Sequence, residues 1–172
     1  MLIAVLFGFL FLTLCVYAAL RDIESLTITN GLNALIAFLF IPAVIVVAPG
    51  WDVAGGHLAA GGIAFVISVI LFMVGAFGGG DAKMIPGVML WLGPEAAMPF
   101  VTIMAVTGGG LAVIVMLARR LVPVTAAPGF ARETLLPGNG VPYGVAIAAG
   151  ALLCAPLSPL LQPISEISTL GS

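Results

Sequence analysis

The chain has 172 residues, of which 62% are hydrophobic and only 7% are charged, and its formal net charge is −2. A soluble domain carries about a quarter charged residues, so this composition excludes a soluble enzyme and a disordered segment. The 5 Lys and Arg residues also exclude the basic surface that a nucleic-acid partner requires. The sequence therefore predicts an integral membrane protein with a single domain over 1–172.

Apolar segments along the chain predict an all-α, polytopic bundle of about six transmembrane helices. A bilayer core of about 30 Å needs roughly 20 apolar residues of helix, and no basic residue precedes the first segment as in a signal peptide. The fourth segment is too short to span this core, so it either begins further back, at Asp81, or re-enters the same face. The expected helices cover about 2–20, 31–48, 53–76, 81–93, 97–118 and 141–162.

The basic residues indicate an orientation. If the fourth segment crosses, the connections 21–30, 77–83 and 119–140 lie on one side and 49–52, 94–96 and the tail after 162 on the other. The first side carries every basic residue of the chain: Arg21, Lys83, Arg119, Arg120 and Arg132. The positive-inside rule then places this side in the cytoplasm and both termini outside, and the one-sided distribution favours six spans.

Two aspartates end helices on this cytoplasmic side. Asp22 follows the first apolar segment and Asp81 opens the fourth. An ionisable residue at membrane depth is a candidate for function, and two carboxyl groups that meet share one proton. Such a pair supplies a base that activates water and an acid that protonates a leaving amine, which is the chemistry of an aspartic protease. A role for Asp22 as an interfacial charge beside Arg21 stays open.

The residues around this pair have alternative interpretations. The Gly78-Gly79-Gly80 run is either a flexible turn or a backbone that a substrate peptide approaches closely. Lys83 either pairs with an ionised Asp81 or extends to lipid headgroups, and Asn30 either caps a helix or orients the first loop. The predicted cytoplasmic loop 119–140 either gates substrate access or simply connects two helices.

Three segments together resemble the type IV prepilin peptidases, the membrane aspartic proteases of the A24 family. Gly78-Gly79-Gly80-Asp81-Ala82-Lys83 resembles the GxGDxK motif of that family, and 22–32 resembles the loop with its first aspartate. Val141-Pro142-Tyr143-Gly144 resembles the Pro-Tyr-Gly opening of its last helix. The resemblance covers roughly 1–155. It departs at Glu24 and Thr29, where the family usually has a basic residue and a proline, so loop shape and substrate preference are in question.

The resemblance implies cleavage of a short basic leader from a prepilin, just after a glycine on the cytoplasmic side of the prepilin's hydrophobic helix. This reaction would take place at the cytoplasmic face of the bacterial inner membrane, with Asp22 and Asp81 catalytic. The residues expected to bind substrate or support the site are Gly78, Gly80, Lys83, Asn30, Pro142 and Tyr143. No metal or organic cofactor is implied. The expected partners are the prepilin, the lipid bilayer and other pilus assembly proteins.

The branch of the family is also an expectation. Full-length bacterial members carry an additional domain with paired CxxC motifs that is linked to N-methylation. This chain begins at the first helix and contains no CxxC, since Cys15 and Cys154 lie apart in apolar segments. It therefore resembles the short, peptidase-only branch that serves Flp-type pili in tight-adherence systems, and methyltransferase activity is not expected.

Three alternatives stay open. A proton-coupled transporter component would use Asp22 and Asp81 as a relay, although such proteins usually contain internal repeats. A non-enzymatic membrane subunit of a pilus or secretion machine would pair the aspartates with partner helices. A protease of the signal-peptide-peptidase kind shares only the GxGD tetrapeptide with this chain.

Overall fold

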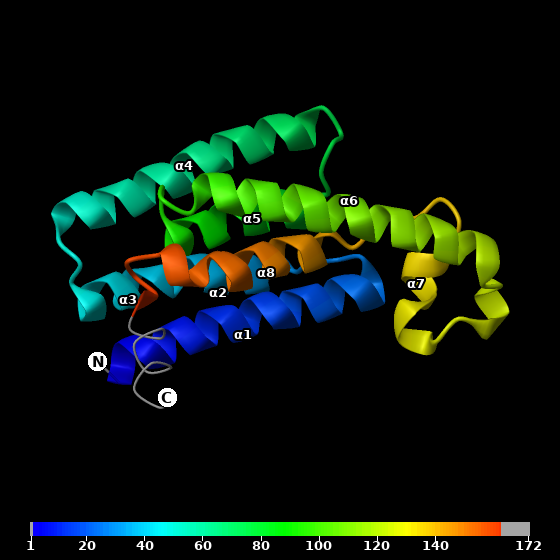
Figure 1. Cartoon of the computed structure of the whole chain (residues 1–172), viewed down its shortest axis with the longest axis horizontal. Coiled ribbons are helices and arrows are strands. Elements are labelled where there is room, and N and C mark those ends of the chain that lie inside the picture. Colours follow the sequence, from blue (N-terminus) through cyan, green and yellow to red (C-terminus); the bar gives the residue numbers. More distant parts are fainter. Residues whose placement is uncertain (1, 163–172) are drawn as a thin grey trace.

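The computed structural model describes residues 2–162, which form helices and connecting segments without a strand. Figure 1 shows the long helices side by side in one elongated bundle. The elements are α1 (Leu2–Ser25), α2 (Asn30–Phe38), α3 (Phe40–Val47), α4 (Trp51–Met73), α5 (Gly79–Leu92), α6 (Ala97–Leu121), η1 (Val124–Ala126), η2 (Gly129–Ala131), α7 (Arg132–Leu135), α8 (Tyr143–Cys154) and η3 (Ala155–Leu157).

The prediction of an all-helical polytopic membrane protein is confirmed. Within the described residues, 4 helical segments are long and apolar enough to cross a membrane: α1, α2 with α3, α4 and α6. The helices α5 and α8 have 14 and 12 residues, and at 1.5 Å per residue they are only about 21 and 18 Å long. Neither spans a core of about 30 Å alone, so a crossing by these two helices stays a prediction.

Several helix boundaries differ from the predicted ones. The segment expected as one helix over 31–48 is divided at Leu39, because Pro42 has no N–H to donate to the carbonyl group of Phe38. The last helix, expected over 141–162, ends at Cys154 and continues as a 3₁₀ turn with Pro156. The helix expected over 97–118 continues to Leu121 and so includes Arg119 and Arg120 in its last turn. The tail after 162 lies outside the described residues.

A cluster of aromatic rings holds the centre of the bundle. The fully buried Phe11 of α1 stacks on Trp91 of α5, with ring centroids 4.6 Å apart and planes 11° from parallel. The Trp91 indole donates a hydrogen bond of 2.8 Å to the Ile36 carbonyl of α2, as a buried indole N–H requires a partner. Phe40 of α3 meets the edge of the same indole, at a centroid distance of 6.3 Å. These contacts join α5 to three helices.

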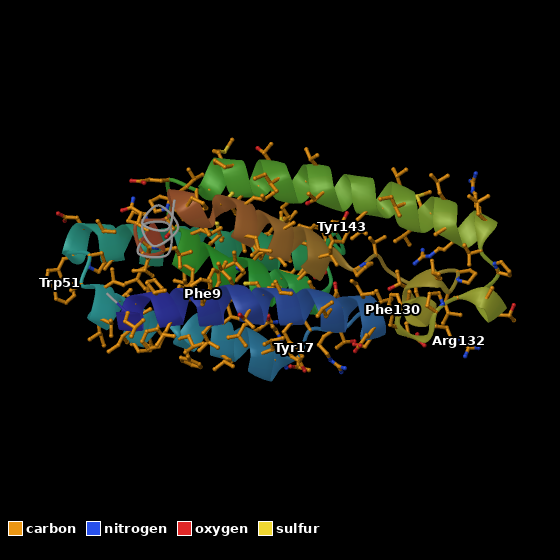
Figure 2. All side chains as sticks on the ribbon, turned by 60° about the horizontal axis from the view of Figure 1, so that its bottom comes forward. Phe9, Tyr17, Trp51, Phe130, Arg132 and Tyr143 are labelled. Carbon is orange, nitrogen blue, oxygen red and sulfur yellow. The ribbon has the colours of Figure 1, made fainter. Side chains whose placement is uncertain are left out.

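The segment between α6 and α8 is attached to the end of α1. Arg119 donates hydrogen bonds to the carbonyl oxygens of Thr134 and Gly140, each at 2.7 Å. The Thr134 hydroxyl donates to the carbonyl oxygen of Ile23 at 2.8 Å. The connection expected over 119–140 is thus partly helical and folds back onto the bundle. Figure 2 shows its Arg132 at the opposite end of the molecule from Trp51.

The Phe11–Trp91 stack predicts that two phenylalanines of α1 contribute unequally to the free energy of unfolding. Phe11 is fully buried, whereas Phe9 is 53% exposed. We expect Phe11→Ala to lower the free energy of unfolding by about 3 kcal/mol, because it leaves a cavity beside Trp91. Phe9→Ala is the matched control and should change it by less than about 0.5 kcal/mol. Denaturant unfolding in detergent micelles measures both, and equal losses would contradict the central role of the stack.

Candidate active site

Asp22 lies one turn before the end of α1 and is only 5% exposed. Its Oδ2 atom accepts a hydrogen bond of 2.7 Å from the backbone N–H of Gly144. Gly144 is the second residue of α8, so this N–H is one of the amides that a helix leaves unpaired at its N-terminus. The positive end of the helix dipole also faces a carboxylate here. The site therefore provides a polar partner for a carboxyl group inside an apolar bundle.

Asp81 lies in the first turn of α5 and is partly buried. Its carboxyl group lies beside Gly78, which precedes the helix. Asp81 and Asp22 are near enough to interact electrostatically, although they belong to different helices. Asp22 thus faces the N-terminal end of α8, and Asp81 lies at the N-terminal end of α5. The fold brings both carboxyl groups to the same end of the bundle.

Ile28 fills the space between the starts of α5 and α8. It is 4% exposed and belongs to the segment that joins α1 to α2. A Cβ atom on Gly80 would lie 3.2 Å from the Cβ atom and the backbone nitrogen of Ile28, and one on Gly144 would lie 3.0 Å from its Cδ1 atom. Both glycines therefore permit a close approach that any side chain would obstruct. The sequence analysis missed Ile28, whose only signal is an apolar residue between the polar Thr27 and Thr29.

Polar side chains join α2 to the start of α5. The buried Asn33 donates a hydrogen bond of 3.1 Å to the carbonyl oxygen of Gly80, next to Asp81. Lys83 donates one of 2.7 Å to the Oδ1 atom of Asn30. Lys83 is therefore bonded to α2, and its ammonium group forms no ion pair with Asp81 among the described residues.

The remaining predicted site residues surround the start of α8. Pro142 is buried and directly precedes this helix. The ring of Tyr143 lies 6.1 Å from that of Phe77, centroid to centroid, and packs against Gly108 of α6. Figure 2 shows Tyr143 at the start of α8, towards the end of the molecule that carries Arg132. The structure thus gathers Gly78, Gly80, Pro142 and Tyr143 near the two aspartates, whereas Asn30 and Lys83 lie on the exposed side.

The described residues contain no group of three or more His, Cys, Asp or Glu side chains that could hold a metal ion. The single histidine, His57, is buried in the N-terminal half of α4. Its Nδ1 atom lies 2.8 Å from the carbonyl oxygen of Leu90. It packs beside Phe40, and its partner Leu90 lies at the opposite end of α5 from Asp81.

The contact between Asp22 and Gly144 predicts that a methyl group added at Gly144 lowers the stability of the fold. In Gly144→Ala the new Cβ atom would lie 3.0 Å from the Oδ2 atom of Asp22 and from the Cδ1 atom of Ile28. We expect this variant to lower the free energy of unfolding by about 2 kcal/mol, as overpacking does. Gly109→Ala is the control, since nothing lies within 4 Å of its added Cβ atom and alanine favours a helix. Unfolding in micelles compares them, and an unchanged Gly144→Ala would contradict this packing.

Comparison with known proteins places this geometry in a family. A model of the type IV leader peptidase family matches residues 9–113, which is more than half of the chain. The matched segment includes both aspartates, Ile28, Asn33 and the glycines before Asp81, whereas the start of α8 lies beyond it. No curated protein and no solved structure matches the chain. The chain therefore belongs to the type IV leader peptidase family and is a membrane protease.

Proposed function

We propose that the protein is an aspartic endopeptidase that removes the leader peptide from Flp-type prepilins at the cytoplasmic face of the bacterial inner membrane. One observation carries this proposal: Asp22 and Asp81 lie on different helices, yet both come to one end of an apolar bundle beside Ile28, near enough for their charges to interact. The Flp-type substrate rests on the resemblance to the peptidase-only branch. The placement of both aspartates at one end, rather than along the bundle, disfavours a proton relay.

In the proposed mechanism the two carboxyl groups share one proton. The ionised carboxylate accepts a proton from water as the water oxygen attacks the carbonyl carbon of the peptide bond. The protonated carboxyl group donates its proton to the leaving nitrogen as the C–N bond breaks. The leader gains a carboxylate and the pilin a new amino terminus. The pair titrates as a unit, so neither residue is assigned as the acid or the base.

The charge distribution supports the proposed orientation. The basic residues lie near the end of α1, in the first turns of α5 and in the segment from the end of α6 to α7: Arg21, Lys83, Arg119, Arg120 and Arg132. Figure 1 shows that these elements meet at one end of the bundle. Under the positive-inside rule this end faces the cytoplasm, where the basic leader of a prepilin also lies. The aspartates would then meet the leader on its own side of the membrane.

The proposal predicts the loss of processing in two isosteric variants. We expect Asp22→Asn and Asp81→Asn each to slow cleavage about 10²–10⁴-fold, the range that acid–base groups contribute. Asp52→Asn is the matched control, because Asp52 is exposed in the first turn of α4 at the other end of the bundle. The measurement is the mass of an Flp-type prepilin that is co-expressed with each variant in cells without their own prepilin peptidase.

The possible outcomes test the proposed substrate and the proposed acid–base mechanism separately. A shortened pilin with wild type and Asp52→Asn, together with intact precursor in the other two variants, would support the two-aspartate peptidase. Processing that persists in both Asp22→Asn and Asp81→Asn would overturn the acid–base assignment. Intact precursor with the wild type, in cells where a known prepilin peptidase processes the same pilin, would overturn the proposed substrate.

A further inference from the structure

An apolar groove of about 490 Å³ runs between α4 and α6, with α5 as its floor. α5 packs on both α4 and α8, and α6 packs on α8, so α4 and α6 are the outer helices on this side of the bundle. The lining positions recur every three or four residues from Gly56 to Leu71 on α4 and from Ala97 to Met104 on α6. Of the described residues that line the groove, Ser68 alone has a polar side chain. The groove is therefore suited to an apolar occupant.

The dimensions of the groove fit an α-helix. Gly56 and Leu71 are 15 residues apart on α4, so the groove follows this helix for about 22 Å. Several lining positions on α4 are small, including Gly56, Ala59 and Ala64. Small side chains in a membrane let the backbone of a second helix approach closely. A helix of about 15 residues would cover the length of the groove.

One end of the groove lies next to the candidate active site. Ile85 lines it and lies one helical turn after Asp81, so the two side chains share a face of α5. Phe77 also lines the groove, directly precedes the Gly78–Gly80 run and contacts Tyr143. The lining residues Phe77 and Ile85 therefore place one end of the groove within about one helical turn of Asp81.

We propose that this groove holds the apolar helix of the prepilin, with the first turn of that helix against Phe77 and Ile85. The inference rests on the proposed function, in which the cleaved bond directly precedes the apolar helix of the substrate. When that bond lies at Asp81, the first turn of the helix must lie within a few residues of it. A polypeptide surrounded by lipid must also be helical, because its backbone has no water to bond. This requirement favours a substrate helix over an acyl chain or a second copy of the protein, because neither of these has to begin at Asp81.

Two neighbouring residues of α4 provide a matched kinetic test. Ile67 lines the groove and is 51% exposed, whereas Val66 does not line it and is 57% exposed. We expect Ile67→Trp to raise the KM for an Flp-type prepilin in vesicles about tenfold, with kcat within about twofold of wild type. Val66→Trp should leave both constants within about twofold. Thermal unfolding of the two variants shows whether they are equally folded.

A second test identifies the occupant directly. A photo-reactive phenylalanine analogue replaces Val101, which lines the groove on α6, or Val106, which does not. The prepilin is present as substrate, and the masses of the adducts are read. We expect an adduct with the prepilin from position 101 and none from position 106. Together, the kinetic and crosslinking results separate a failure of the groove proposal from a failure of the proposed function.

The groove proposal is overturned if the wild type processes the prepilin, Ile67→Trp behaves like Val66→Trp, and position 101 reacts only with phospholipid or a second copy of the chain. The proposed function then stands. An adduct with the prepilin at position 101 without any cleavage would support the groove and contradict the proposed function. Neither cleavage nor a prepilin adduct would overturn both.

Discussion

The stack of Phe11 on Trp91 sets the relative height of α1 and α5, and the geometry of the site depends on this register. The two helices run in opposite directions in Figure 1. Asp22 lies 11 residues after Phe11, and Asp81 lies 10 residues before Trp91. At 1.5 Å per residue these separations are about 16 and 15 Å, so the two aspartates lie at nearly the same level. A ring contact in the middle of the bundle thus aligns two carboxyl groups at its end.

A buried carboxyl group also needs a hydrogen-bond partner, since an unpaired one is costly in an apolar environment. Gly144 supplies that partner to Asp22 from the other end of the chain, and Ile28 fits against Gly144 and Gly80. The first loop, α5 and α8 are therefore packed around the same few atoms. This packing excludes side chains from both glycines. Asp81 lies one helical turn before Ile85, which lines the groove between α4 and α6.

The membrane class and the approximate helices follow from composition and apolar length, which are local properties. The two aspartates were also identifiable, because each lies at the end of an apolar segment and Asp81 follows a glycine run. The contacts that position them were not identifiable from the sequence. Asp22 and Gly144 are 122 residues apart, and Asn33 and Gly80 are 47 residues apart. No local pattern predicts such pairs. The division at Leu39 has a visible signal in Pro42, but apolar length alone predicts one continuous helix over 31–48.

The central claim is that Asp22 and Asp81 act as one chemical unit, and a double-mutant cycle tests it most directly. Cleavage of a prepilin by an excess of purified enzyme would be timed for Asp22→Asn, Asp81→Asn and the double variant. Residues that act as a unit give losses that are far from additive in free energy. We expect the double variant to be about as slow as either single variant, because each substitution alone already disables the pair. Losses that multiply in the double variant, or a single variant that keeps the wild-type rate, would contradict it.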